Sequence, residues 1–331
     1  MKWLLVPALA GKPWNGSTIH TESLGGSEAS IAFTARALAK AGEEVHVITH
    51  GTPGTFEEVI YHDQIEAPYI ISKTWDVVLV SRWIDALNGV DWKTNIRFFW
   101  AHDLPQQHQE LKCNKVVMLS QYQASHWGTD PAYTVLIGDG VDIDLFRNGG
   151  DSNRDPNKLV WISNPDRGLA IAARIFQEAR KRWPDLELHV YGRSSIYGWT
   201  DDIEAPFLPK DADMENVFLK ASLPRYALAA ELRTAHAVFY PTFWPETFCM
   251  ATLEAQAAGT PVICPPLAAL NETVKGGILT HDFLNAISQL RNKRRWEKLS
   301  KLGVEYAEQN TWDIRAKQWI NLSQEVADAN N

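Results

Sequence analysis

The chain has 331 residues, of which 45% are hydrophobic and 22% are charged, as in ordinary globular proteins. This length suits two domains of about 150 residues each. The three cysteines make neither a disulfide framework nor a close pair for a metal, which favours a reducing, cytoplasmic location. No stretch approaches the roughly 18 apolar residues that a membrane span needs.

The charge is negative and unevenly distributed. The net charge is −8, and residues 1–150 hold 11 Lys and Arg against 17 Asp and Glu, which gives −6 for that half. An acidic first half is a poor electrostatic match for nucleic acid or for an anionic membrane. A basic run at 291–301 is expected to be a solvated helix face, and peripheral membrane contact through it is not favoured.

The first half alternates predicted strands with helical or loop segments. Residues 1–10 imitate a signal peptide, but Pro7 breaks the apolar stretch, and residues 2–8 are interpreted as a first buried strand. A loop containing Gly25 and Gly26 then opens a helix that runs to Ala41, with Gly42 beyond its end. Strand, glycine-containing loop and helix form a phosphate-binding Rossmann-like unit, although the dinucleotide fingerprint is absent. Further strands are predicted at 44–49, 75–80, 97–100, 116–120 and 134–137.

His102 and Asp103 directly follow the predicted strand at 97–100. A side chain at the carboxyl end of a parallel strand points to the edge where open α/β sheets bind ligands. His102 is therefore a candidate functional residue, although a single histidine is more often structural. Asp103 could orient its ring or bind a hydroxyl group.

The second half repeats the alternation after a polar linker at 148–158. Strands are predicted at 159–162, 186–191 and 237–240. The segment around Asn164 and Arg167 opens a helix that runs to Arg182 and stops at Pro184. A last helix is predicted over 312–327, with Trp312, Ala316, Trp319 and Ile320 on one face.

The segment 240–263 carries the strongest pattern. A strand end leads through Pro241 and Pro245 into a helix that ends at Ala258, with Gly259 just past its end. Glu246 stands before this helix and Glu254 on it. The start of a helix favours a phosphate, and ionised carboxylates accept strongly from hydroxyl groups. The combination predicts a ligand with a phosphate flanked by hydroxyl-rich groups.

This segment resembles the E-x7-E segment of retaining GT-B glycosyltransferases of the GT4 type, also called glycosyltransferase group 1. The resemblance implies an α/β protein with two Rossmann-like α/β/α domains that face each other across a deep cleft, and a C-terminal helix that packs back on the first domain. The expected division is an acceptor-side domain at 1–148, a nucleotide-sugar donor domain at 149–310, and the crossing helix at 311–331.

The resemblance also implies roles for individual residues. Glu246 would contact the donor sugar and Glu254 the ribose hydroxyls, with Arg167 stabilising the leaving diphosphate and His102 touching the donor sugar. His102, Asp103, Arg167 and Glu246 are thus the expected catalytic residues. The expected donor-binding residues are Gly25, Gly26, Asn164, Arg167, Arg193, Thr247, Phe248, Cys249, Met250, Thr252 and Glu254.

Three positions depart from the family pattern. Cys249-Met250 stands where the family has Gly-Leu or Gly-Ile, Asn164 lies near the usual first diphosphate cation, and Asp139 replaces the usual Asn. Arg193 or Arg225 could supply the missing positive charge. These departures keep open the alternative of a catalytically weak or dead nucleotide-sugar-binding protein.

The predicted function is retaining transfer of a sugar from a UDP- or GDP-sugar to a hydroxyl acceptor such as a saccharide or lipid-linked glycan. No metal or other cofactor is expected, because no metal-ligand spacing occurs in the sequence. A sugar-nucleotide epimerase on the same fold is a second alternative. A dehydrogenase is disfavoured by the absent dinucleotide fingerprint.

Overall fold

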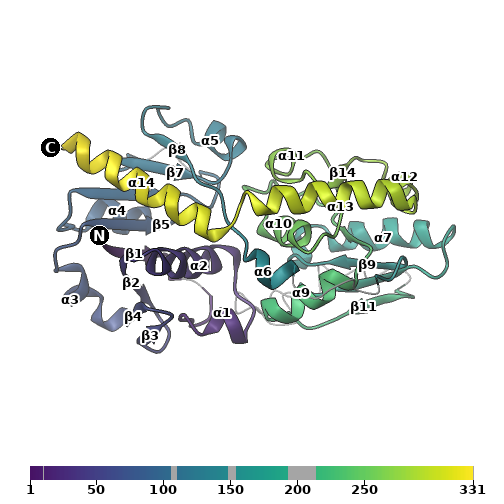
Figure 1. Ribbon diagram of the computed structural model, residues 1–331, viewed down its shortest axis with the longest axis horizontal. Coiled ribbons are helices and arrows are strands. Elements are labelled where there is room, and N and C mark those ends of the chain that lie inside the picture. Colours follow the sequence, from purple (N-terminus) through teal and green to yellow (C-terminus); the bar gives the residue numbers. More distant parts are fainter. Residues whose placement is uncertain (10, 106–109, 148–153, 193–213, 331) are drawn as a thin grey trace. The chain divides into compact units, whose positions relative to one another are not determined.

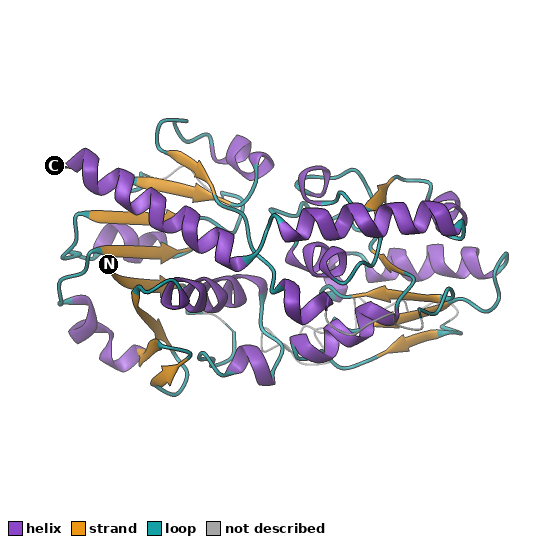
Figure 2. Cartoon of the chain, in the orientation of Figure 1, coloured by secondary structure: helices purple, strands orange, loops and turns teal. Residues whose placement is uncertain are grey.

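The computed structural model describes residues 1–9, 11–105, 110–147, 154–192 and 214–330 (Figure 1). The chain divides into two compact units, Met1–Gly140 together with Trp312–Asn331, and Val141–Thr311. Arg193, one of the expected donor-binding residues, lies outside the described residues. Each unit is a parallel sheet with helices packed against it (Figure 2), which confirms the predicted α/β class.

The first unit is built on an eight-stranded sheet of order β3-β4-β2-β1-β5-β6-β7-β8. Every neighbouring pair is parallel except β3 with β4. Its strands are β1 (Lys2–Pro7), β2 (Glu44–Thr49), β3 (Gly54–Phe56), β4 (Val59–Asp63), β5 (Val77–Ser81), β6 (Ile96–Trp100), β7 (Lys115–Met118) and β8 (Thr134–Leu136). Its helices are α1 (Thr18–Thr21), α2 (Gly26–Lys40), the 3-10 turn η1 (Gln64–Glu66), α3 (Ala67–Ile71), α4 (Ile84–Gly89), α5 (Gln121–Trp127) and α14 (Trp312–Asn330).

The β3–β4 hairpin is absent from the sequence prediction. Glu57 and Glu58, which connect its two strands, both have a positive φ, 48° and 66°. Glycine or asparagine normally marks such a turn, so two glutamates there give no sequence signal.

Helix α14 packs within the first unit, as the sequence predicted. Trp312 stacks on Phe33 of α2 at 5.4 Å, and Trp319 meets the rings of Phe98 and Trp100 on β6. The buried stripe of α14 therefore completes the side of the sheet that α2 also covers. The opposite side packs a core of aliphatic and aromatic residues against α3, α4 and α5, with Trp75, Trp92 and Met118 buried in it.

The second unit has a six-stranded, wholly parallel sheet of order β11-β10-β9-β12-β13-β14. Its strands are β9 (Lys158–Trp161), β10 (Glu187–Val190), β11 (Val217–Leu219), β12 (Ala237–Phe239), β13 (Val262–Cys264) and β14 (Gly277–Leu279). Its helices are α6 (Ile143–Arg147), the 3-10 turn η2 (Pro165–Arg167), α7 (Leu169–Arg180), α9 (Arg225–Thr234), α10 (Met250–Ala257), α11 (Leu270–Thr273), α12 (Phe283–Leu290) and α13 (Lys293–Glu308).

The contact boundary between the units falls at Gly140–Val141, earlier than the expected boundary at 148. Helix α6 belongs to the second unit because it packs on α9, where Arg233 donates from Nη1 to the carbonyl oxygen of Leu145 at 3.0 Å. The basic run at 291–301 lies largely on α13 and is mostly exposed, as expected for a solvated face.

Candidate functional site

The second unit has a topological switch point between β9 and β12. In the order β11-β10-β9-β12-β13-β14, the chain proceeds outward from β9 on one side and from β12 on the other. Open α/β sheets bind ligands outside the carboxyl ends of the strands at such a point. Two loops meet there, one running from β9 through η2 to α7, and one from β12 to α10. Thr242 joins them by donating its hydroxyl to the carbonyl oxygen of Arg167 at 2.6 Å.

Arg167 and Glu246 form an ion pair across these two loops. Nη1 of Arg167 lies 2.8 Å from Oε1 and 3.1 Å from Oε2 of Glu246. Glu246 is 4% exposed, so its carboxylate needs a partner of opposite charge. The guanidinium of Arg167 also lies over the ring of Trp244, 5.4 Å from its centroid. The structure thus joins two residues to which the sequence gave separate catalytic roles.

Tyr240 fixes the carboxylate of Glu246 from the other side. Its hydroxyl donates to Oε1 of Glu246 and lies 3.2 Å from Oγ of Ser163. Burial, reinforced by the negative charge of Glu246, raises the pKa of Tyr240 well above its usual value. Tyr240 therefore stays protonated and acts as a donor. Sequence reasoning gave it no role, although it is the first residue of the segment 240–263.

Glu254 has an arginine partner of its own. Nε of Arg225 donates to Oε1 of Glu254 at 2.7 Å, and Nη2 of Arg225 lies 3.2 Å from the sulfur of Met250. The side chains of both charged residues are largely buried, 11% and 6% exposed. Arg225, which the sequence offered only as a replacement cation, is thus held beside the carboxylate expected to bind ribose.

Between the two glutamates most side chains are buried, so the backbone of this segment is more available to a ligand than its side chains. Phe248, Cys249 and Met250 are buried, and the buried hydroxyl of Thr252 donates to the carbonyl oxygen of Cys249 at 2.8 Å. Cys249 is the N-cap of α10 with φ of 73°, a left-handed conformation that glycine adopts without strain. In the first turn of α10, the N–H of Thr252 already donates to the carbonyl oxygen of Cys249 at 3.1 Å. Unpaired N–H groups at the start of a helix are suited to bind a phosphate. Thr247, half-buried, stands just before this helix.

Besides Arg167, the loop after β9 supplies a second expected residue and one unexpected residue. Asn164 is the buried N-cap of η2. Asp166, next to Arg167, has a buried Oδ1 with no hydrogen-bond partner among the described residues. Burial raises the pKa of this carboxyl, opposed by Arg167 and assisted by Glu246. Nothing in the sequence distinguished Asp166 from an ordinary loop acid.

The expected site residues of the first unit lie around its own switch point, between β1 and β5. Gly25 is the N-cap of α2, and a Cβ added at Gly26 would meet no atom within 4 Å, so no packing within the described chain requires that glycine. His102 is buried against Trp100, with ring centroids 4.5 Å apart. Burial, aided by the charge of Arg82, lowers the pKa of His102 to about 3, so its imidazole is neutral.

Arg82, which the sequence did not single out, organises the polar groups of this region. Its Nε donates to Oδ2 of Asp103 at 2.6 Å and its Nη1 to Oγ of Ser27 at 2.8 Å. Arg82 follows β5 directly and has φ of 64°. A residue at the carboxyl end of a central strand at the switch point was the available signal.

The described residues contain neither a metal-ligand group nor a membrane-spanning helix. No three His, Cys, Asp or Glu side chains within the described ranges are grouped as metal ligands. Within the same ranges, no helix combines the length and the apolar character that crossing a bilayer requires.

The second unit is similar in sequence to a known protein family. Residues 156–295 match the family model for glycosyl transferases group 1. The D-inositol 3-phosphate glycosyltransferase of Kribbella flavida is 26% identical over 216 residues, which are 58% of this chain and 50% of that protein. The enzyme of the same name from Geodermatophilus obscurus is 30% identical over 172 residues, 46% of this chain and 37% of that protein. The chain spans about half the length of the first of these relatives.

Comparison with solved structures covers the whole chain. Sucrose-phosphate synthase from Thermosynechococcus elongatus has a TM-score of 0.75 at 19% identity, with 99% of this chain and 100% of that chain covered. HepE from Anabaena, solved with UDP and glucose, has a TM-score of 0.69 at 14% identity, with 98% and 100% covered. The chain therefore has the GT-B fold, and residues 156–295 of its second unit match the glycosyl transferases group 1 family.

Proposed function

We propose that this protein is a retaining glycosyltransferase that moves a sugar from a UDP- or GDP-sugar to a hydroxyl acceptor. The observation that carries the proposal is the Arg167–Glu246 pair at the switch point of the second unit, beside the N-terminus of α10. The first donors of a helix, a cation and a fixed carboxylate suit a ligand that joins a diphosphate to a sugar.

The donor would be held by groups that the structure already orients. The diphosphate would lie at the N-terminus of α10 and take charge stabilisation from Arg167 and from backbone N–H groups. Glu246 accepts from Arg167 and Tyr240, and a carboxylate has about four acceptor sites, so it retains capacity for a sugar hydroxyl. Glu254, oriented by Arg225, would accept from the ribose hydroxyls.

The chemistry would need no metal, because departure of the diphosphate is stabilised by Arg167 and the backbone. The departing phosphate would take the acceptor proton on the same face of the sugar, so that the anomeric configuration is retained. His102, neutral because it is buried, would contact the donor sugar without adding charge. Asp103, held by Arg82, would orient the acceptor hydroxyl. HepE, solved with UDP-glucose, provides a precedent for the donor class on this fold.

The test is to incubate the protein with UDP- and GDP-sugars, with and without a panel of sugar and glycoside acceptors. Released nucleotide diphosphate and the glycosylated product are then quantified, and NMR of the product gives the anomeric configuration. Transfer with the configuration of the donor is the expected result, whereas an inverted product would refute retention. An altered sugar nucleotide formed without acceptor would indicate an epimerase. Donor binding without any product would indicate a nucleotide-sugar-binding protein.

A further inference from the structure

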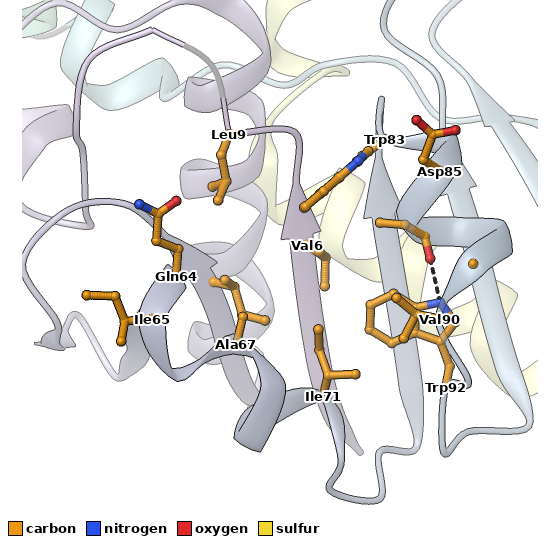
Figure 3. Close-up of a pocket in the computed structure, with 13 residues that line it drawn as sticks. Val6, Leu9, Gln64, Ile65, Ala67, Ile71, Trp83, Asp85, Val90 and Trp92 are labelled. Atoms are coloured by element: carbon orange, nitrogen blue, oxygen red, sulfur yellow. Dashed lines mark hydrogen bonds between the residues drawn. The ribbon is translucent and has the colours of Figure 1, made fainter.

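The first unit contains a cavity of about 570 Å³ that none of the expected site residues lines (Figure 3). Its walls come from the carboxyl ends of β1 and β2, the segments that follow β4 and β5, and the helices α3 and α4. This is the edge at which a parallel sheet binds ligands, next to the β1–β5 switch point. The cavity lies wholly within residues 6–92.

The lining is apolar. Val6, Ile48 and Ile71 contribute aliphatic surface, and Trp83 and Trp92 contribute rings. The indole N–H of Trp92 donates to the carbonyl oxygen of Ala86 at 3.1 Å, so this ring requires no polar partner in the cavity. The polar side chains of the lining are Gln64 and Asp85, and none of the described lining residues is Lys, Arg or His.

The size and the exposed rim distinguish this cavity from a packing defect. Protein interiors contain few voids larger than a water molecule, whereas small-molecule sites typically measure about 300–1,000 Å³. Ile65 is 85% exposed and Trp83 is 40% exposed, although both line the cavity. Burial of exposed apolar side chains is favourable, so large ones at the rim of an apolar cavity indicate a site for an apolar ligand.

The lining of the cavity is next in the sequence to the hydrogen-bonded group of Arg82, Asp103 and Ser27. Trp83, in its lining, immediately follows Arg82, whose guanidinium contacts Asp103 and Ser27. A molecule with an apolar body in the cavity could thus present a hydroxyl group to the Arg82–Asp103 pair.

We propose that this cavity binds the compact apolar part of an uncharged hydroxylated acceptor, such as an aromatic or alicyclic glycoside or alcohol. The proposal rests on the proposed function, because it assigns the acceptor class of the same reaction. The charge of the lining excludes an anionic ligand group. Asp85 is the only ionisable side chain of the described lining, so it would repel an acceptor whose anionic group enters the cavity.

The binding test compares three glucose derivatives, methyl β-D-glucoside, phenyl β-D-glucoside and glucose 6-phosphate, of which the two glycosides differ only in the aglycone. Calorimetry is done on the full chain without donor. Burial of one ring is expected to make phenyl β-D-glucoside bind roughly 10- to 100-fold more tightly than methyl β-D-glucoside. Glucose 6-phosphate should bind no better than the methyl glycoside. Equal affinities for the two glycosides, or a preference for the phosphate, would overturn the proposal.

Variants locate that preference in the cavity. Gly89 lines the cavity at the end of α4, and a Cβ added there meets no atom within 4 Å, so the first side-chain carbon of Gly89→Leu is accommodated without a clash. Both Gly89→Leu and Trp83→Ala should abolish the preference for the phenyl glycoside. Tyr69→Ala is the matched control, because Tyr69 is 67% exposed on α3 and lies outside the lining. A preference that survives both cavity variants would place the ring elsewhere and overturn the proposal.

Transfer provides the second readout and separates this proposal from the proposed function. With a competent donor, the parent should use phenyl β-D-glucoside with a kcat/KM at least tenfold above that for methyl β-D-glucoside. Gly89→Leu should equalise the two values without changing donor KM. If no donor supports transfer, the proposed function fails, and the calorimetric preference with its loss in Gly89→Leu still decides whether the cavity takes an apolar ligand.

Discussion

The central strands of the two units have the same order around their switch points. The side chains at the two switch points differ in chemical character. At β9 and β12 the second unit has two buried glutamates, each paired with an arginine. At β1 and β5 the first unit has an apolar cavity, and the carboxylate of its Arg82–Asp103 pair is far more exposed, at 60% against 6% for each glutamate. One region is suited to a charged, hydroxyl-rich ligand, and the other to an uncharged one.

This difference separates what the fold determines from what the loops determine. The strand order sets where a ligand lies in each unit, and the residues that follow the strands set which ligand it is. Glu246 and Glu254 are buried with their partners already in place, so these two side chains are pre-oriented for a ligand. Variants of Glu246, Glu254 and their arginine partners should therefore change nucleotide-sugar binding or turnover, whereas variants in the first unit should leave nucleotide binding unchanged.

The largest expected effect is that of Glu246→Gln. Loss of a charged hydrogen-bond acceptor beside the reacting sugar should lower kcat by roughly 10- to 150-fold and reduce sugar selectivity. Initial rates at saturating donor measure it. Glu297→Gln on the exposed face of α13 is the matched control and should be unchanged. A raised donor KM with kcat unaltered would instead assign Glu246 to ground-state binding.

The buried, neutral His102 should make stability depend on pH. Its pKa is lowered to about 3, whereas an exposed or unfolded histidine titrates near 6.5. As the pH falls below 6.5, the unfolded state binds a proton that the folded state takes up only near pH 3. The free energy of unfolding of the parent therefore decreases between pH 6.5 and pH 3. The decrease is about 1.4 kcal/mol per pH unit, or about 2 kcal/mol by pH 5.

Urea unfolding of the parent and of His102→Gln, from pH 7 to pH 5, measures this effect. Other buried histidines, such as His236 with its pKa lowered to about 4, are present in both proteins and cancel. The variant should lose less stability over the window by about 2 kcal/mol. Parallel curves would show that His102 is accessible to protons in the folded state.

His102→Ala should affect turnover and leave nucleotide binding alone. Loss of one neutral hydrogen bond to the donor sugar should reduce kcat by about 2- to 12-fold, with the affinity for free nucleotide diphosphate unchanged. Rates per folded molecule, together with calorimetry, measure the two quantities. An unfolded variant with an unchanged rate per folded molecule would make His102 a packing residue.

The smallest expected effect is that of a chelator. If Arg167 and the α10 N-terminus supply the charge stabilisation, the rate in excess EDTA should equal the rate without it. A strict requirement for a divalent cation would contradict the metal-independent mechanism.

Sequence reasoning predicted the elements that have local signals. Gly259 ends α10 with φ of 69°, and Gly42 follows α2 with φ of 95°, so glycine marked both helix ends. The aromatic stripe of α14 predicted which of its faces is buried, whereas its packing on the first unit was implied by the family resemblance. Positions where other residues adopt the left-handed conformation gave no such signal. Cys249 is one of them, and its φ of 73° explains why the family has glycine there.

The pairings within the site could not be predicted from the sequence. Arg167 and Glu246 are separated by 79 positions, and Arg225 and Glu254 by 29. Motif spacing identified the glutamates but contained no information about which arginine each one meets. The cavity of the first unit was equally hidden, because Val6, Ile48 and Trp83 read as ordinary core positions of separate strands and loops.

The most direct test of the account is the affinity of free UDP and GDP for the parent, Glu246→Gln and Glu254→Gln, measured by calorimetry. These ligands have the ribose and diphosphate but no transferred sugar. We expect Glu246→Gln to bind the preferred nucleotide almost as well as the parent, and Glu254→Gln to bind it roughly 10- to 150-fold more weakly. The reverse pattern would show that the two glutamates have exchanged roles. Equal affinity in all three proteins would show that the nucleotide does not bind at this switch point.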